Sequence, residues 1–404
     1  MDYKEIYESW LNDERLCGEA KAELEAVKDN KEEIEYRFGA ELEFGTAGMR
    51  GIIGYGTNMM NVYTVKRATQ GLSEFINTLG EQAKCRGVVI SFDTRLKSDV
   101  FARAAAEVLA ANGVKAYLFD DVHPVPMLSF AVRCLNATAG IMITASHNPK
   151  QYNGYKVYGG DGAQMSPEDT AVVVDFIKNI NDYLGTASPS AEQKKKYIKR
   201  VPSSVDRKYY KELKKLTLSK SAVKECGKDL KLVYTPVHGS GYIQVTTILK
   251  KIGINATVVE EQTVKDVEFS TVEVPNPEFK ETLSLGIKLA QNIGATVVFG
   301  TDPDSDRLGV AVKNGDGEFE ALSGNQVCIL LLDYILTRLK EEGKLPSNAA
   351  VVKSFVTTGM AKSLCRQFDV KLFEVPVGFK FIGEKIKLWE QDHSHTFIFG
   401  FEES

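Results

Sequence analysis

The sequence predicts an α/β protein, because short apolar runs alternate with stretches of helical spacing over most of its 404 residues. Each run ends in a polar or glycine-bearing loop, which is typical of strands buried on both faces of a largely parallel sheet. In such sheets ligands bind outside the carboxyl ends of the strands. The loops that follow the runs are therefore where functional residues are expected.

Six apolar runs carry this pattern, and a helix through Ala104 and Leu109 to Gly113 is predicted after the first of them. The first 45 residues differ, because their apolar side chains recur at three- and four-residue spacings and predict helix. The six runs are residues 87–92, 139–143, 230–234, 295–299, 350–355 and 396–399.

Two segments are predicted to connect domains. The lysine-rich residues 193–200, followed by 201–204, lead out of the first domain. A second connection is expected near residues 322–324, after a turn at 314–317. The predicted domains are residues 1–205, 206–322 and 323–404.

Composition excludes several classes of protein. Lys and Arg total 50 against 54 Asp and Glu, a net charge of -4, which disfavours binding to nucleic acid or to an anionic membrane by charge. Six scattered cysteines without a C-x-x-C pair predict buried, reduced thiols. The N-terminus lacks an apolar signal core, and the longest apolar run, 327–336, is shorter than the roughly 20 residues that a membrane helix needs. A soluble, cytoplasmic protein is expected.

Residues 144–156 form the most informative loop. Ser146 follows a predicted buried strand, where its hydroxyl is placed to act as a nucleophile or to carry a phosphoryl group. Pro149 disfavours helical geometry at Asn148, and Asn153-Gly154 predicts a second turn. The alternative is an ordinary turn that joins two strands. His147, next to Ser146, is a candidate general base or a loop hydrogen-bonding residue.

A second loop holds three carboxylates on alternate residues, and it directly follows the apolar run 295–299. Asp302, Asp304 and Asp306 can converge on one hard cation such as Mg²⁺, and without a cation their repulsion would raise at least one pKa. Arg307 can offset this charge or bind a phosphate. The alternatives are a solvated acidic turn and an aspartyl-phosphate enzyme with Asp302 as nucleophile and Asp304 as acid and base.

Two further loops are candidates for ligand binding. Residues 45–51 set Arg50 among glycines, so that backbone and a cation can both approach an anion. Residues 400–404 offer carboxylates and a hydroxyl suited to sugar hydroxyls. An ordinary glycine turn and an acidic strand end are the respective alternatives.

Taken in chain order, these four loops resemble the α-D-phosphohexomutase superfamily of phosphoglucomutases and phosphomannomutases. Thr144–Pro149 is similar to the family's phosphoserine loop, and Gly300–Arg307 to its metal loop. Gly400–Ser404 is similar to its sugar-binding loop, and Gly45–Gly51 to its N-terminal glycine–arginine segment. Phe401 and the helical N-terminus most resemble the branch that holds phosphoglucomutase and phosphopentomutase activities.

The resemblance implies consecutive domains of mixed α/β layers around a central active-site cleft. They would be a phosphoserine-loop domain with a helical N-terminus, a metal-binding-loop domain and a sugar-binding domain. The implied activity is that of a Mg²⁺-dependent phosphoglucomutase, an isomerase that interconverts sugar 1-phosphate and 6-phosphate through a phosphoserine and a sugar bisphosphate. Glucose 1,6-bisphosphate is the implied activator. A phosphomannomutase or phosphopentomutase is the alternative within the family.

The resemblance also implies roles for individual residues. Ser146 would carry the phosphoryl group and, through a phosphoserine oxygen, share the metal with the three aspartates. Lys156 and Arg50 would act near the transferred group, with Lys156 a candidate for proton transfer, and His147 stays a catalytic candidate from its place next to Ser146. Substrate would be bound by Lys380, Glu402, Ser404 and Arg307.

One departure from the family concerns its fourth domain, which binds the phosphate that is not transferred. The sequence ends at Ser404, inside the sugar loop, so the expectation is that this domain is missing, the third domain is incomplete and turnover is slower than in a longer form. Two other hypotheses remain open: a phosphatase or phosphotransferase with Asp302 as its covalent centre, and a catalytically inert sugar-phosphate-binding module.

Overall fold

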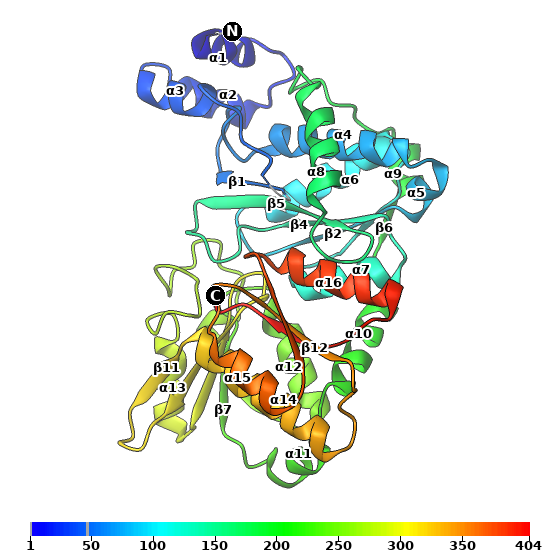
Figure 1. Cartoon of the computed structure of the whole chain (residues 1–404). Helices are drawn as coiled ribbons and strands as arrows, with labels where there is room; N and C mark the ends of the chain where they lie inside the picture. Colours follow the sequence, from blue (N-terminus) through cyan, green and yellow to red (C-terminus); the bar gives the residue numbers. More distant parts are fainter. Residues whose placement is uncertain (1, 46–47) are drawn as a thin grey trace. The chain divides into compact units, whose positions relative to one another are not determined.

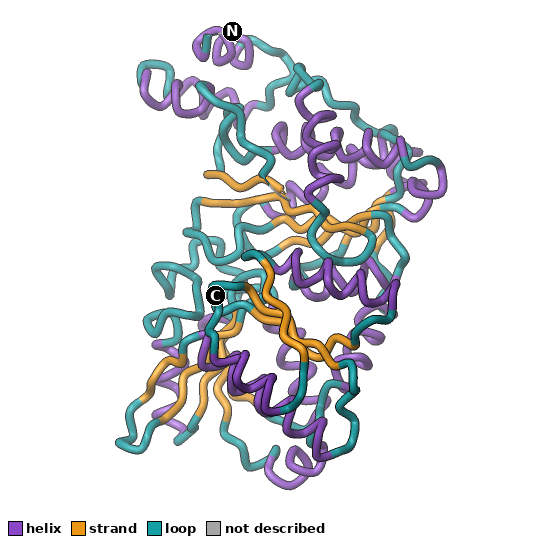
Figure 2. The backbone as a smooth tube through the Cα atoms, viewed as in Figure 1, coloured by secondary structure: helices purple, strands orange, loops and turns teal. Residues whose placement is uncertain are grey.

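The computed structural model describes residues 2–45 and 48–404 (Figure 1). It divides into two compact units, Met1–Pro202 and Ser203–Ser404. Helices and strands alternate along each unit, as Figure 2 shows. The predicted α/β class is therefore confirmed.

The first unit is built on a six-stranded mixed sheet in the order β1-β5-β4-β2-β3-β6. Strands β2, β3, β4 and β6 are parallel, whereas β5 is antiparallel to both β4 and β1. The carboxyl ends of β2 and β4 therefore lie side by side at one edge. The strands are β1 (Gly48–Ile52), β2 (Val88–Phe92), β3 (Ala116–Leu118), β4 (Ala139–Ile143), β5 (Tyr152–Gly159) and β6 (Ile198–Arg200).

Helices cover both faces of this sheet (Figure 1). One face packs against four helices, α4, α5, α6 and α8, through a continuous core that includes Leu72, Ile90, Phe101 and Ile141, all at most 1% exposed. The other face packs against α7, which contacts β2 and β4. The helices on the two faces together are α4 (Val62–Thr78), α5 (Glu81–Arg86), α6 (Ser98–Ala111), α7 (Val125–Cys134), α8 (Pro167–Lys178) and α9 (Ala191–Tyr197).

The helical N-terminus consists of three short helices rather than one long segment: α1 (Tyr3–Leu11), α2 (Gly18–Ala26) and α3 (Lys31–Phe38). They form a second core around Trp10, which makes edge contacts with Phe38 and Tyr63. The prediction of helix for residues 1–45 is thus confirmed for α1, α2 and α3. It is wrong for the segments between these helices and after α3. Residues such as Asn30, whose side chain accepts the Glu33 N–H, begin a new helix instead of continuing one.

The second unit contains two sheets. The five-stranded sheet has the order β11-β10-β9-β7-β8, with β7, β8 and β9 parallel and β10 and β11 forming an antiparallel hairpin around the predicted turn at 314–317. Helix α13 packs on it through Ile287 and Ala290. The elements are α10 (Ser204–Lys215), α11 (Lys220–Cys226), β7 (Leu232–Thr235), α12 (Gly241–Ile252), β8 (Ala256–Val258), α13 (Ser284–Ile293), β9 (Val297–Thr301), β10 (Leu308–Lys313) and β11 (Phe319–Leu322).

The three-stranded sheet is fully parallel, in the order β13-β12-β14. Buried side chains of β12 alternate between two cores, one shared with α14 and α15 and the other with α16. Ser323 caps α14 in a capping box with Gln326. The elements are α14 (Gly324–Glu341), β12 (Ala349–Ser354), α15 (Met360–Gln367), β13 (Lys371–Val375), α16 (Phe379–Asp392) and β14 (Thr396–Phe401).

Three local predictions are wrong. Residues 193–200 are not a connection, because they form α9 and β6, and β6 pairs with β3 in the first sheet. Asn153-Gly154 is not a turn, because both residues lie inside β5. All six cysteines are free, but Cys17, Cys85 and Cys226 are exposed rather than buried. The predicted domain boundaries stay a prediction.

Among residues 2–45 and 48–404, no helix combines the length and the apolar composition that crossing a membrane requires.

Candidate active site

The Ser146 loop begins immediately after β4. Ser146 is 3% exposed and has a left-handed backbone with φ of 52°. This conformation costs a non-glycine residue about 1–3 kcal/mol, so the surrounding structure has to hold it. The Ser146 N–H donates to Thr144 Oγ1 over 2.8 Å, and the Ser146 hydroxyl lies 3.3 Å from His147 Nδ1. Ser146 therefore has a defined place at the edge of the sheet.

Arg95 fastens this loop to the neighbouring strand. Its side chain is fully buried, and its Nη2 donates to the carbonyl oxygens of Ser146 and Asn148 at 2.6 and 2.5 Å. Its Nη1 donates to the carbonyls of Pro149 and Tyr152 at 3.0 and 3.1 Å. One guanidinium thus binds four carbonyl oxygens spread over seven residues, which fixes the course of the loop.

Asp93 is the counter-charge of Arg95. Its carboxylate accepts hydrogen bonds from the hydroxyls of Thr144 and Ser98 at 2.6 and 2.7 Å, and it lies 3.4 Å from Arg95 Nε. Complete burial raises the pKa of Asp93, and the Arg95 guanidinium is the largest opposing influence. Asp93 follows β2 and Thr144 follows β4, so this carboxylate joins the two strand ends.

Asp93 and Arg95 directly follow the predicted strand at 87–92, but the sequence analysis assigns them no role in the site. The signal was present, because an aspartate and an arginine two residues apart follow the largely apolar run 87–92. What the sequence does not show is that the partners of Arg95 lie more than 50 residues further along the chain.

The structure places Arg50 and Lys156 on neighbouring strands of the same unit. Arg50, on β1, is exposed, and its Nη1 donates to Asn148 Oδ1 over 2.6 Å. Lys156 is half-buried in the middle of β5, opposite Met142 of β4. Arg50 therefore contacts the Ser146 loop directly. Within the predicted 45–51 segment, Thr46 and Ala47 lie outside the described residues.

The three aspartates of the second unit converge at the carboxyl end of β9. One ligand oxygen from each of Asp302, Asp304 and Asp306 lies within 4.8 Å of the others. Asp302 and Asp304 are fully buried. Asp302 Oδ1 accepts the N–H groups of Asp306 and Arg307 at 3.2 and 3.1 Å, so the loop curls around this carboxylate. Three hard oxygen donors at this spacing fit a divalent cation such as Mg²⁺.

The loop after β7 supports the aspartates from the adjacent parallel strand. Both the N–H and the hydroxyl of Ser240 donate to the Pro303 carbonyl over 2.8 Å. A Cβ atom on Gly239 would lie 2.6 Å from Pro303 Cα, so only glycine allows this approach. His238 spans Val264 O and Thr271 Oγ1 at 3.0 and 2.7 Å. Sequence reasoning missed Gly239 and Ser240, because their partner lies over 60 residues away.

The sugar-loop candidates lie after β14. The Gly378 N–H donates to Glu402 Oε1 over 2.7 Å. The Ser404 hydroxyl accepts from Arg307 Nη1 over 3.1 Å and donates to Glu278 Oε2 over 3.2 Å. The structure therefore brings Arg307 and Ser404 together, and it adds Glu278, which the sequence did not indicate.

Lys380 is the remaining sequence-predicted residue of this unit. It lies in the first turn of α16, two residues after Gly378, and its Nζ is 4.9 Å from the centroid of the Phe381 ring. Lys380 is thus in the segment that contacts Glu402 through Gly378.

Three family models match consecutive parts of the chain, in the same order as the loops described above. Models of the phosphoglucomutase/phosphomannomutase α/β/α domains I, II and III match residues 41–184, 207–315 and 323–404. The chain belongs to the phosphoglucomutase/phosphomannomutase family. The family resemblance inferred from the four loops is thereby confirmed.

Individual relatives agree with this assignment. A phosphoglucomutase of Staphylococcus aureus strain N315 is 39% identical over 381 residues, which cover 93% of the chain and 66% of the relative. The chain thus spans slightly less than two thirds of that relative. The crystal structure of a putative phosphomannomutase from Thermus thermophilus is 26% identical with a TM-score of 0.71, over 90% of this chain and 74% of that one. A Burkholderia thailandensis family protein, 22% identical over 85% of this chain and 68% of that one, shares the fold at a TM-score of 0.67.

The pKa of Glu402 leads to a first testable prediction. Burial raises this pKa, the Gly378 N–H opposes the shift, and the adjacent Glu403 carboxylate adds to it. A carboxyl group with a raised pKa holds more protons when folded, so its contribution to stability falls as pH rises above its usual value of 4.5. We expect the stability of the wild type relative to Glu402→Gln to decline over this range, measured by urea denaturation at each pH. Parallel pH curves for the two proteins would contradict the shift.

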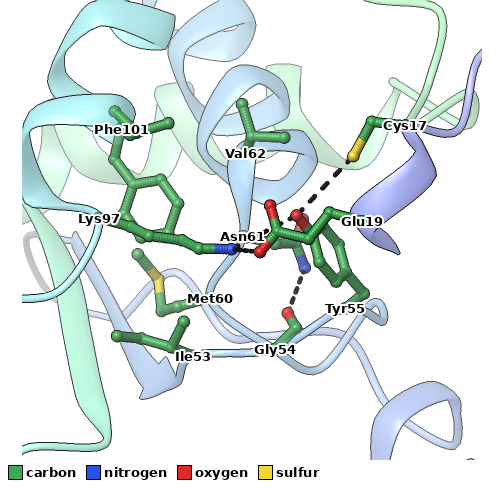
Figure 3. Close-up of a pocket in the computed structure, with 11 residues that line it drawn as sticks. Cys17, Glu19, Ile53, Gly54, Tyr55, Met60, Asn61, Val62, Lys97 and Phe101 are labelled. Carbon is green, nitrogen blue, oxygen red and sulfur yellow. Dashed lines mark hydrogen bonds and ion pairs between the residues drawn. The ribbon is translucent and has the colours of Figure 1, made fainter. Parts of the chain in front are cut away.

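A separate cavity of about 190 Å³ lies in the first unit between the N-terminal helices and the start of α6 (Figure 3). Lys97 spans it, with its Nζ 2.5 Å from Glu19 Oε1 and 3.4 Å from the Tyr55 hydroxyl. None of the predicted site residues lines it, so this cavity is distinct from the Ser146 loop. Its lining is Cys17, Glu19, Ile53, Gly54, Tyr55, Met60, Asn61, Val62, Lys97, Val100 and Phe101.

Proposed function

We propose that the chain is a Mg²⁺-dependent sugar phosphomutase that interconverts sugar 1-phosphate and 6-phosphate. The observation that carries this proposal is Ser146, a buried serine in a strained conformation whose carbonyl accepts from the Arg95 guanidinium and whose N–H donates to Thr144, itself bonded to Asp93. The Staphylococcus aureus relative that is 39% identical to the chain is a phosphoglucomutase. This similarity favours glucose phosphates as the substrates of the chain. Mannose and pentose phosphates are the alternatives within the family.

The reaction would consist of two phosphoryl transfers. Phosphoserine 146 donates its phosphoryl group to a sugar monophosphate hydroxyl, so the Oγ–P bond breaks, a new sugar O–P bond forms and the hydroxyl proton moves to Ser146 Oγ. The resulting bisphosphate then returns its other phosphate to Ser146. His147 Nδ1 lies 3.3 Å from Ser146 Oγ, where it can accept or donate the serine proton. Lys156 is the candidate for proton transfer at the sugar hydroxyl.

Charge neutralisation is what such transfers chiefly require from a protein. Asp302, Asp304 and Asp306 would hold Mg²⁺, with a phosphoserine oxygen as a further ligand. The ion supplies Lewis-acid stabilisation of charge on the phosphoryl oxygens. Arg50 contacts the Ser146 loop through Asn148 and would add a guanidinium near the transferred group.

Substrate orientation would depend on the second unit. Glu402 and Ser404 would accept and donate hydrogen bonds to sugar hydroxyls, with Arg307 and Lys380 binding phosphate oxygens. The Arg307–Ser404 hydrogen bond supports this assignment, because it joins the sugar loop to the metal loop. We also propose three functional domains, 1–205, 206–322 and 323–404, and glucose 1,6-bisphosphate as the activator that loads Ser146.

Phosphate mapping tests the proposal. The protein is incubated with Mg²⁺ and glucose 1,6-bisphosphate, digested, and the phosphorylated peptide is identified beside a Ser146→Ala variant. We expect phosphate on Ser146 in the wild type and none in the variant. Phosphate on Asp302 would instead support the aspartyl-phosphate hypothesis, and no phosphate on either residue would support an inert binding module.

A further inference from the structure

The loop that ends in Ser404 contains two adjacent carboxylates with different surroundings. Glu402 receives the Gly378 N–H, from the segment between β13 and α16. Glu403 instead receives the hydroxyls of Thr357 and Ser354, the latter over 3.4 Å, from the end of β12. These two adjacent carboxylates therefore contact different segments of the unit.

The hydroxyl pair that contacts Glu403 is itself held by a buried ammonium group. Lys353, 1% exposed, donates from its Nζ to the Thr357 carbonyl over 2.8 Å and to the Ser354 carbonyl over 3.1 Å. The same Nζ lies 2.8 Å from a carboxylate oxygen of Glu374 on β13. A buried ammonium has to be fully paired, so this arrangement fixes residues 354–357 rigidly.

The backbone of the sugar loop is fixed from the other side by α14. A Cβ atom on Gly324 would lie 1.6 Å from the Glu403 carbonyl oxygen, so the first residue of α14 packs directly on that peptide. One turn further along, the Cys328 thiol donates to the Glu402 carbonyl over 3.4 Å. The backbone of Glu403 thus packs against α14, and its carboxylate accepts a hydrogen bond from the end of β12. These two contacts fix Glu403 from two sides.

We propose that Glu403 is a positioning residue for sugar recognition, which rests on the proposed mutase function. Its carboxylate, held by Thr357, Ser354 and behind them Lys353, sets the position of Glu402 and Ser404 on either side of it. Glu403 does not contact the substrate. The chemical consequence is that the acceptor capacity of residue 403 matters, while its negative charge does not.

Steady-state kinetics with glucose 1-phosphate and calorimetric binding of glucose 6-phosphate test this inference. Glu403→Ala should raise KM and Kd roughly 10- to 100-fold, because small displacements of binding groups cost that much. Glu403→Gln keeps an oxygen that accepts the Thr357 hydroxyl. Its KM and Kd should therefore stay within about threefold of the wild-type values, because the hydrogen bond is retained. Thr357→Val should reproduce the alanine effect, and Glu384→Ala, an exposed change on α16, is the matched control.

A double-mutant cycle separates positioning from a general loss of structure. If Glu403 acts through Glu402 and Ser404, then Glu403→Ala should add little to the KM of a variant that carries both Glu402→Gln and Ser404→Ala. Additive effects, or a glutamine variant as impaired as the alanine variant, would overturn the positioning role. An active wild type whose KM is unchanged in Glu403→Ala would overturn it as well. A wild type that neither binds nor converts any sugar phosphate would overturn the proposed function, and this inference with it.

Discussion

Replacing Arg95 with leucine is expected to lower the free energy of unfolding by about 3–5 kcal/mol, because it leaves a buried charge without its partner. The Asp93 carboxylate is fully buried and would have to take up a proton or remain uncompensated. Four carbonyl oxygens, from Ser146 to Tyr152, would lose their donor in the same step. Urea denaturation followed by circular dichroism measures the change.

A nearby ion pair supplies the control for this experiment. Arg103 and Asp99 form an i,i+4 pair on α6 at 2.9 Å, but their side chains are 68% and 46% exposed. Removing an exposed pair of this kind costs only about 0.3–0.5 kcal/mol, so Arg103→Leu should be nearly neutral. Similar losses in the two variants would show that Arg95 is no more than a surface cation. Arg95→Lys should recover part of the loss, since an ammonium keeps the charge but not the fork of donors.

How well a feature can be predicted from the sequence depends on how close together its residues lie along the chain. The six apolar runs can be found because a largely buried strand consists of consecutive apolar residues, and Ser146 and the aspartates follow two of these strands, β4 and β9. Asp302, Asp304 and Asp306 can be recognised as a group because they are neighbours in the chain. Residues 193–200 are misleading, since the lysines of the short helix α9 and the basic edge strand β6 together have the composition of a linker.

Supporting residues were missed for the opposite reason. Arg95, Ser240, Glu278 and Thr357 each act on a partner at least 46 residues away, so their immediate sequence does not show what they contact. Asn153-Gly154 has a strong local preference for turns, yet pairing with β1 and a hydrogen bond from the Thr144 N–H to the Gly154 carbonyl keep it extended. Long-range pairing thus overrides local preference at the points where the site is assembled.

The second large effect concerns Asp302, Asp304 and Asp306. The change in folding stability caused by Asp304→Asn should differ in sign with and without Mg²⁺. In the wild type Mg²⁺ should stabilise the folded state, by about 2.7 kcal/mol at a concentration of 100 times Kd. Asp304→Asn should lose most of this gain, because one of the oxygen donors is no longer charged. Without Mg²⁺ the same variant should be at least as stable as the wild type, since neutralising one of three converging carboxylates relieves repulsion.

Thermal unfolding with and without Mg²⁺ measures both arms of this prediction, independently of catalysis. Asp316→Asn is the control, because Asp316 is an exposed residue of the hairpin turn between β10 and β11 and should respond to Mg²⁺ like the wild type. A Mg²⁺-induced rise in Tm that survives Asp304→Asn would exclude the triad as the metal site. A variant that is strongly destabilised in EDTA would indicate that Asp304 serves the fold of the loop rather than a cation.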